Sequence, residues 1–247
     1  MKLDPVLLNM ACSWSIKAYR EKNKDAIKIE SKITGATCFI AKRKSIDVIA
    51  FRGTQKKLND ILTDLFVVPL PYASRLCHGG FVVQHASIWK QIKKHIDPKK
   101  RTLITGHSLG GALAELSAAK LTHPNLNVVT FGKPNTFFKG FKRPMELDTQ
   151  LSIINHCDSV AVLPRLCYGP SKSQQVLFHG GNGIDYIDPD TLTKKEDRKT
   201  GSITERATDH YIENYKTRLE KYFDNERKAL KEDIKDLNKL ADEVENA

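Results

Sequence analysis

A short apolar strand, a tight turn and a slender helix follow one another in the middle of the chain. The strand segment is Thr102–Thr105, and from Gly106 the turn reads Gly-His-Ser-Leu-Gly-Gly. Glycines on both sides of Ser108 let a strand and a helix approach without side-chain collision. Three alanines keep the following helix thin: Ala112, Ala114 and Ala118. Such a unit requires a sheet with a helix on its face, and it lifts the serine above the sheet edge.

The rest of the chain alternates between β-rich and helical segments. Before the serine turn, the strand segments are separated only by turn residues, which favours antiparallel neighbours; after it, helices intervene. We expect strands over Ala26–Glu30, Ala36–Lys42, Ile46–Arg52, Thr102–Thr105, Asn127–Phe131, Leu151–Asn155 and Gln175–His179, and helices over Val82–Ile96 and Leu109–Leu121. This order predicts an α/β fold of the α/β-hydrolase type, with a mostly parallel central sheet and helices on both faces.

The last 36 residues, 212–247, differ in composition from the rest. They contain no Gly or Pro and are rich in Lys, Glu, Asp and Leu. Apolar residues alternate spacings of four and three at Leu230, Ile234, Leu237, Ala241 and Val244, which predicts a long amphipathic helix. We therefore divide the chain into a hydrolase-like domain, 1–211, and a helical C-terminal extension, 212–247. The helix packs on the body or projects from it; self-association through its apolar face is the alternative.

The net charge of +11 is concentrated in residues 1–211, which carry +13. The lysines are scattered rather than interleaved with aromatic residues, which argues against a nucleic-acid partner. A basic body suits contact with anionic lipid, although a solvated surface without a partner fits equally well. No apolar run reaches the roughly 20 residues of a transmembrane segment, and residues 1–20 do not resemble a secretory signal. With an odd number of cysteines, five, these features predict a cytoplasmic or peripherally membrane-associated protein, or a mature form with its signal removed.

A serine nucleophile needs a base, and the base needs an orienting carboxylate. In α/β-hydrolases these groups follow in the order serine, acid, histidine. Asp158 comes just after the strand segment Leu151–Asn155, where a loop at the sheet edge would hold its carboxylate. Both His179 and His210 lie downstream of Asp158, and the residues alone leave both open as the base.

Motifs in a fixed order extend from residue 46 to residue 210. They are Val48–Thr54 (V-I-A-F-R-G-T), Asn59–Pro71, His78–Phe81 (H-x-G-F), the serine turn, Val128–Pro134 (ending F-G-x-P), Asn155–Pro164, and Asp209–Tyr211 with Tyr215 beyond. This series resembles the class 3 lipases, the family of fungal triacylglycerol lipases and their plant and microbial relatives. Asn135 departs from the family, because many members have Arg there, and the segment between Asp158 and His210 matches little.

The resemblance implies a catalytic triad of Ser108, Asp158 and His210, with His179 in a structural turn. It also implies an oxyanion hole formed by the backbone N–H and hydroxyl of Thr54 and the backbone N–H of Leu109. Fixed donors of this kind stabilise the negative charge on the carbonyl oxygen, each by about 3–4 kcal/mol.

A short apolar stripe follows the strand that ends at Thr54. Its residues have helical spacing: Leu58, Ile61, Leu62 and Leu65. By pattern alone they indicate an ordinary core-facing helix. The resemblance implies instead a lid, which closes over an apolar trench and swings away at a lipid surface.

Together these features predict a serine carboxylic-ester hydrolase that acts on acyl lipids through an acyl-enzyme intermediate. Triacylglycerol, diacylglycerol and phospholipid at a membrane or droplet surface all remain candidate substrates. We expect no cofactor and no metal, because the chain has no HExxH, paired Cys/His, Walker or GxGxxG pattern. The alternatives are a catalytically silent, lipase-like scaffold that binds lipid or protein, and an acyltransferase or peptidase on the same fold.

Overall fold

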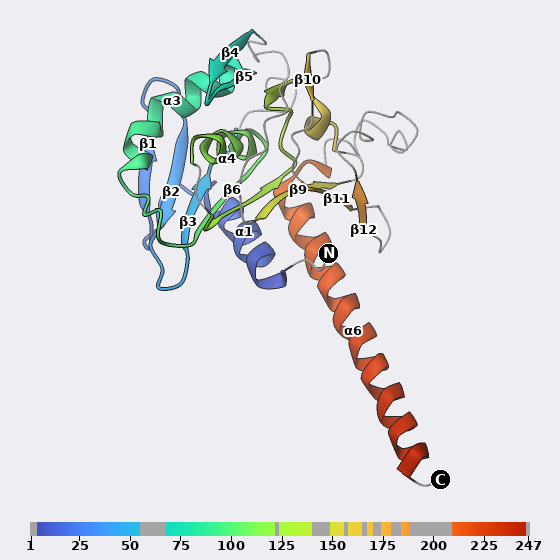
Figure 1. Ribbon diagram of the computed structural model, residues 1–247. Coiled ribbons are helices and arrows are strands. Elements are labelled where there is room, and N and C mark those ends of the chain that lie inside the picture. The colour runs from blue at the N-terminus through green and yellow to red at the C-terminus, as the bar shows by residue number, and fades with distance from the viewer. Residues whose placement is uncertain are drawn as a thin grey trace.

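The computed structural model describes residues 4–54, 68–121, 124–139, 149–155, 158–164, 167–169, 174–178, 184–187 and 209–245. Its centre is an eight-stranded sheet in the order β1-β2-β3-β6-β7-β9-β11-β12 (Figure 1). The strands are β1 (Ile27–Glu30), β2 (Thr37–Ala41), β3 (Asp47–Phe51), β6 (Thr102–His107), β7 (Leu126–Phe131), β9 (Thr149–Asn155), β11 (Gln174–Phe178) and β12 (Ile184–Ile187). All seven predicted strands are present, with ends shifted by at most two residues.

The middle of the sheet is parallel and its edges are antiparallel. Strands β3, β6, β7, β9 and β11 run in the same direction, whereas β1, β2 and β12 pair in the antiparallel sense. Every residue of β3, β6 and β7 is buried, as expected for parallel strands that are covered on both faces. This arrangement brings the carboxyl ends of β6 and β9 to the same edge of the sheet.

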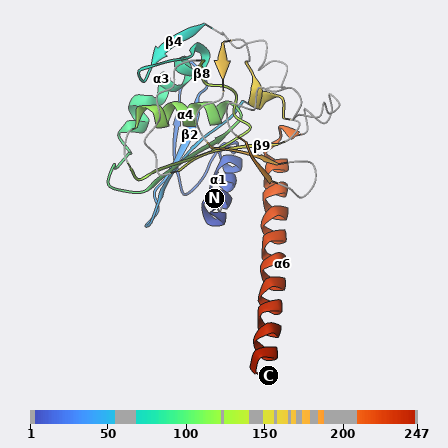
Figure 2. The same cartoon turned by 45° about the vertical axis from the view of Figure 1, so that its right-hand side comes forward.

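Helices cover both faces of the sheet. Viewed along its edge, the sheet has α3 (Gly79–Lys93) and α4 (Leu109–Lys120) on one side and α1 (Pro5–Lys17) and α6 (Ile212–Glu245) on the other (Figure 2). Alternate residues of β3 enter opposite cores, because successive side chains of a strand point to opposite faces. Val48 and Ala50 pack with α1 and α6, whereas Ile49 and Phe51 pack with α3 and α4. The predicted α/β-hydrolase architecture is confirmed.

Helix α1 was not predicted from the sequence. It begins at Pro5 after a cap by Asp4, whose carboxylate accepts hydrogen bonds from the backbone N–H groups of Val6 (2.9 Å) and Leu7 (3.2 Å). An acidic cap followed by proline is a favourable helix start. The helix lies against β6, where the hydroxyl of Ser15 is 2.9 Å from that of Thr105.

A second, four-stranded sheet was also missed. Its order is β10-β8-β5-β4, with β4 (Pro69–Tyr72), β5 (Arg75–His78), β8 (Phe137–Phe138) and β10 (Tyr168–Gly169). Between β4 and β5, Ala73 and Ser74 adopt positive φ values of 51° and 60°, the backbone of a tight two-residue hairpin. Pro69–Pro71, the end of the motif Asn59–Pro71, is therefore strand. The predicted lid residues Leu58, Ile61, Leu62 and Leu65 lie outside the described residues.

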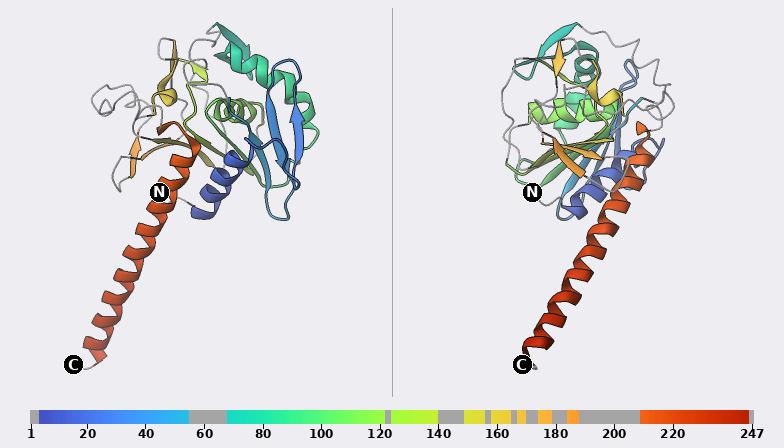
Figure 3. Two further views of the ribbon diagram at one scale, coloured as in Figure 1. Left: turned by 180° about the vertical axis from the view of Figure 1, so that it is seen from behind. Right: turned by 90° about the vertical axis from the view of Figure 1, so that its right-hand side faces the viewer.

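Helix α6 is 34 residues long and has two parts. Its first turns are buried in one core with α1, through Ile212, Tyr215, Leu219 and Phe223. The remainder projects away from the body (Figures 1 and 3). The side chains of the predicted apolar seam, Leu230 to Val244, lie outside the described residues, and the division of the chain at residue 211 stays a prediction. None of the described helices combines the length and the apolar character that a membrane-spanning segment requires.

Candidate active site

Ser108 occupies the sharp turn between β6 and α4. Its φ of 56° lies in the left-handed region, which non-glycine residues seldom adopt and which is found at strained functional positions. The turn is tight enough to require glycine at its flanks: a Cβ on Gly110 would lie 2.3 Å from the backbone oxygen of Phe51. The sequence thus builds the predicted strand–turn–helix unit, with Ser108 at its apex.

The three residues predicted as a triad lie within hydrogen-bond distance of one another. His210 places its Nε2 2.8 Å from Oγ of Ser108 and its Nδ1 2.9 Å from Oδ2 of Asp158. A carboxylate only accepts hydrogen bonds, so Nδ1 carries the proton and Nε2 is left to accept from the serine hydroxyl. This is the arrangement that serine hydrolases use for proton transfer.

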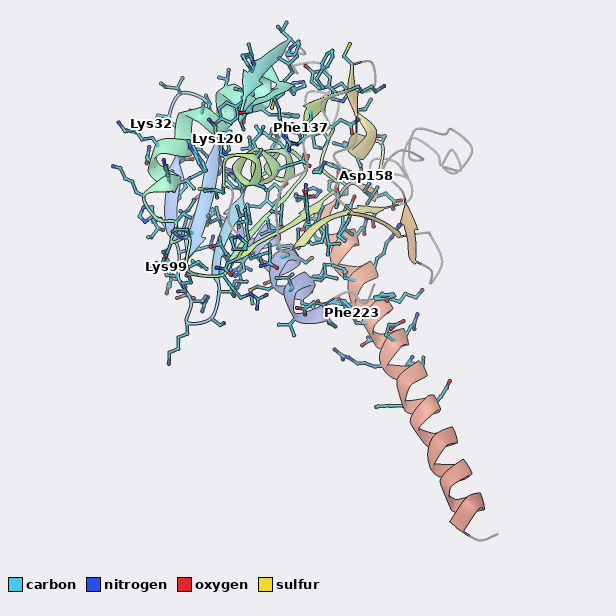
Figure 4. All side chains as sticks on the ribbon, viewed as in Figure 1. Lys32, Lys99, Lys120, Phe137, Asp158 and Phe223 are labelled. Atoms are coloured by element: carbon cyan, nitrogen blue, oxygen red, sulfur yellow. The ribbon has the colours of Figure 1, made fainter. Side chains whose placement is uncertain are left out.

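Asp158 is buried just beyond the end of β9, beside the start of α6 (Figure 4). The hydroxyl of Tyr215 donates to its Oδ2 at 2.5 Å, and the backbone N–H of Val160 donates to its Oδ1 at 2.9 Å. Burial alone would raise the pKa of this carboxyl group. The attraction of His210 and the hydrogen bonds from His210 and Tyr215 outweigh burial and hold the pKa below its usual value. Asp158 is therefore ionised at neutral pH.

Several supporting residues were not predicted from the sequence. Tyr215 was noted only as part of a motif, yet it anchors Asp158 and accepts a 3.1 Å hydrogen bond from the backbone N–H of Asn155. The side chain of Asn155 in turn donates to the backbone oxygen of Asp209 at 2.8 Å. Gly132 has a φ of 53°, and a Cβ there would lie 2.4 Å from Oδ2 of Asp158. Of these supporting contacts, the sequence indicated only the close approach at Gly132, through the glycine of the F-G-x-P motif.

The two predicted oxyanion donors lie on segments that meet at the serine turn. Leu109 is the first residue of α4, where the backbone N–H groups have no partner within the helix. Strand β3 pairs with β6 so that Phe51 lies opposite Gly106, and the chain continues from there to Thr54. A Cβ on Gly53 would lie 2.7 Å from the backbone oxygen of His107. The structure thus brings both segments beside Ser108, and the oxyanion role stays a prediction.

Other candidates contribute nothing to the described site. His210 contacts the hydroxyl of Ser108, whereas His179 lies outside the described residues. In the part of the chain that the structure describes, no three His, Cys, Asp or Glu side chains gather as a metal site would require. The four described cysteines, Cys12, Cys38, Cys77 and Cys167, are free thiols.

A serine on a strand–helix elbow, above a mostly parallel sheet and in contact with a histidine–aspartate pair, defines the α/β-hydrolase class. Residues 48–167 match the model of a family within this class, described as Lipase (class 3). The segment whose motifs resemble the class 3 lipases thus matches the model of that family.

Two curated relatives each match somewhat less than half of the chain. The lipase ZK262.3 of Caenorhabditis elegans is 29% identical over 132 residues, which are 47% of this chain and 37% of that protein. A secreted mono- and diacylglycerol lipase of Fusarium solani is 28% identical over 119 residues, which are 44% of this chain and 35% of that protein. The chain therefore spans little more than a third of the length of these relatives.

Solved fungal lipases share the fold. A lipase from Rhizopus microsporus var. chinensis superposes with a TM-score of 0.61 and 19% identity, covering 84% of this chain and 85% of that one. The triacylglyceride lipase of Rhizomucor miehei superposes with a TM-score of 0.59 and 21% identity, covering 69% and 78%. At these identities the likeness shows the common architecture.

Proposed function

We propose that the protein is a serine carboxylic-ester hydrolase that acts on acyl lipids, such as triacylglycerol, diacylglycerol or phospholipid. The observation that carries this proposal is the chain of contacts from Oγ of Ser108 through His210 to Asp158. The match of residues 48–167 to the class 3 lipase model supports a lipid ester as the substrate. The named relatives, a lipase and a mono- and diacylglycerol lipase, point in the same direction.

The reaction follows from the direction of the hydrogen bonds. Nε2 of His210 accepts the hydroxyl proton of Ser108 as Oγ attacks the ester carbonyl. The resulting oxyanion receives hydrogen bonds from the backbone N–H and hydroxyl of Thr54 and from the backbone N–H of Leu109. When the tetrahedral intermediate collapses, the C–O bond to the alcohol breaks and the alcohol leaves with the proton from His210.

Water completes the cycle. His210 accepts a proton from the water molecule that attacks the acyl–Ser108 ester, and it returns this proton to Ser108 as the fatty acid departs. Asp158 stays ionised throughout and stabilises the imidazolium that forms twice in each turnover. Its burial strengthens this electrostatic attraction, because little water is present to screen it.

The lipid is met at a membrane or droplet surface, with the protein held there peripherally. The support for this part of the proposal is the net charge of +11, since each basic residue near an anionic surface contributes about 1 kcal/mol. The apolar stripe Leu58, Ile61, Leu62 and Leu65 acts as the lid over the acyl-chain site. Cosedimentation with vesicles tests the location. The protein is expected to bind anionic vesicles but not zwitterionic ones. A protein that binds neither kind of vesicle would contradict this part of the proposal.

Self-association through the projecting part of α6 is a separate element of the proposal. Its support is the apolar seam of the sequence, Leu230 to Val244, on a helix that leaves the body after Phe223. Sedimentation velocity tests it with wild type and a Leu237→Lys variant. A dimer that dissociates in the variant is expected, and a monomeric wild type at all concentrations contradicts it.

Hydrolysis of p-nitrophenyl esters of increasing acyl length tests the activity, with wild type, Ser108→Ala and Ser117→Ala. Ser117 is a matched control, because it lies on α4, the helix that follows Ser108, and its hydroxyl also bonds a histidine, His85. We expect Ser108→Ala to lose at least about 1,000-fold in kcat and Ser117→Ala to remain active. Wild-type turnover should rise with chain length and increase when micelles form.

Three outcomes would contradict the proposal. Turnover confined to short, soluble esters would show that the protein is a plain esterase and would contradict the assignment of a lid. No turnover of any ester by folded wild type would favour the catalytically silent scaffold. Retained activity in Ser108→Ala would refute the assignment of the nucleophile.

A further inference from the structure

A tyrosine from the N-terminal part of the chain reaches the centre of the site. Tyr19 lies two residues beyond the end of α1, and its hydroxyl oxygen is 2.7 Å from Nδ1 of His107. His107 directly precedes Ser108 in the elbow. Tyr19 lies outside both the motif series and the segment 48–167 that matches the family model, so neither assigns it a role.

The second ring nitrogen of His107 leads to the base. Its Nε2 is 2.6 Å from the backbone oxygen of His210, and the two imidazole rings lie 4.7 Å apart between centroids. A carbonyl oxygen only accepts, so the proton of His107 is on Nε2 and its Nδ1 accepts from the hydroxyl of Tyr19. Burial lowers the pKa of His107 to about 3 and raises that of Tyr19. The pair therefore keeps these donor and acceptor roles at neutral pH.

His210 is thus held at two places by independent contacts. Asp158, supported by Tyr215, fixes its imidazole ring through Nδ1. His107, supported by Tyr19, fixes its main chain through the carbonyl oxygen. A ring on a shifted backbone would lose its alignment with Ser108 even if its hydrogen bond to Asp158 survived.

The same hydroxyl also packs against the segment that leads to Thr54. A Cβ on Gly53 would lie 2.1 Å from the hydroxyl oxygen of Tyr19 and 2.7 Å from the backbone oxygen of His107. The hydroxyl group therefore fills the space between this segment and the serine turn. The hydroxyl oxygen of Tyr19 thus contacts the segment that leads to Thr54. It is also linked through His107 to Ser108 and His210.

We propose that Tyr19 is a positioning residue for ester hydrolysis: its hydroxyl orients His107, which holds the backbone of His210, and its contact with Gly53 sets the approach of Thr54 to the serine. This role rests on the proposed function. Alignment matters because a misplacement of the reacting groups by about 1 Å can reduce the rate about 100-fold. Helix α1, to which Tyr19 is attached, is accordingly part of the catalytic framework.

The variant Tyr19→Phe removes the hydroxyl and keeps the ring. We expect kcat to fall about 10-fold while KM stays within about twofold, because alignment and not substrate binding is lost. Ser117→Ala is the matched control, since it removes a buried hydrogen bond of the same length, 2.7 Å, to Nε2 of His85. It should lose comparable stability and keep kcat. If Tyr19→Phe loses only stability, as this control does, the positioning role is overturned.

Nitrogen-15 NMR of the histidine side chains gives a readout that does not depend on turnover. With His107 assigned from a His107→Gln spectrum, we expect a neutral ring protonated on Nε2 at pH 7. In Tyr19→Phe, the Nδ1 resonance of His107 and the Nδ1–H proton resonance of His210 should both shift, whereas Ser117→Ala should leave the His210 signal unchanged. A wild type that hydrolyses no ester would refute the proposed function alone. A proton on Nδ1 of His107, or an unmoved His210 signal in Tyr19→Phe, would refute the role of Tyr19.

Discussion

Helix α4 carries a serine–histidine pair near each of its ends. Ser108 precedes its first turn, with Oγ 2.8 Å from Nε2 of His210, and Ser117 lies in its third turn, with Oγ 2.7 Å from Nε2 of His85. Each histidine also has a partner on Nδ1. For His210 this is Asp158 at 2.9 Å, and for His85 it is the hydroxyl of Tyr72 at 2.7 Å. By these distances alone, the Ser108 set (Ser108, His210 and Asp158) and the Ser117 set (Ser117, His85 and Tyr72) are equivalent.

The third member separates them chemically. Asp158 is an anion, which stabilises a positive charge on His210 when the serine proton is transferred. Tyr72 is neutral, and burial of its partner His85 lowers the pKa of that ring to about 3. The Ser117 set therefore holds its histidine uncharged at neutral pH and lacks the anion that would stabilise a transferred proton.

The position of the serine on the helix is the second difference. Ser108 stands at a positive φ directly before Leu109, the first residue of α4, whose backbone N–H is a predicted oxyanion donor. Ser117 is fully buried in the helix interior, where backbone N–H groups already donate to the preceding turn. Hydrogen-bond distances alone therefore do not define a catalytic triad. A triad also needs an anion beside the histidine and backbone N–H donors for the oxyanion.

Replacing the carboxylate tests the first difference and has the largest expected effect. Asp158→Asn should lower kcat by about 10,000-fold, the size expected when a triad carboxylate becomes an amide. Its counterpart Tyr72→Phe should leave kcat within about twofold, because the Ser117 set does no chemistry. Steady-state kinetics on one soluble ester measures both, and an equal loss in the two variants would break the comparison.

Removing the support of the carboxylate should have a smaller effect. Tyr215→Phe deletes the hydroxyl that donates to Asp158 and leaves the backbone N–H of Asn155 without its acceptor. We expect about a 10-fold loss in kcat and about 1–3 kcal/mol in the free energy of unfolding. Kinetics combined with urea unfolding separates the two losses. A variant as active as wild type would show that Asp158 is held in place without the hydroxyl of Tyr215.

The Ser117 set should affect the stability of the protein in acid and not its activity. Unfolded His85 takes up a proton near its ordinary pKa of 6.5, whereas folded His85 stays neutral until about pH 3. Its contribution to stability is therefore complete above pH 6.5 and is lost as the pH falls toward 3, at about 1.4 kcal/mol per pH unit.

Urea unfolding of wild type and His85→Gln between pH 7 and pH 4 measures this effect. The glutamine does not titrate, so the free energy of unfolding should fall less steeply with decreasing pH in the variant. Equal slopes in the two proteins would mean that His85 is protonated in the folded state.

The sequence predicted the Ser108 set because each member sits in a local motif. Ser108 follows an apolar strand and precedes a small-residue helix, and Asp158 follows another strand, so the sheet brings them to one edge. His210 was separated from His179 only by the family resemblance, since no local pattern distinguished them.

The rest of the site depends on contacts between distant residues. Tyr19 and His107 are 88 positions apart, and Tyr215 and Asp158 are 57 apart; neither pair leaves a local periodicity. Helix α1 and the four-stranded sheet were missed for related reasons. The apolar residues of α1 occur in broken pairs, and strands β8 and β10 have only two residues each.

Labelling with an alkyl fluorophosphonate tests the central claim most directly, because the reagent phosphonylates only a serine activated by a working base and oxyanion hole. Peptide mass spectrometry of labelled wild type should place the phosphonate on Ser108 and leave Ser117 unmodified. Ser108→Ala should not be labelled, and Asp158→Asn should be labelled far more slowly than wild type. A wild type that stays unlabelled, or a Ser108→Ala variant that is still labelled, would contradict the assignment of Ser108, His210 and Asp158 as the catalytic residues.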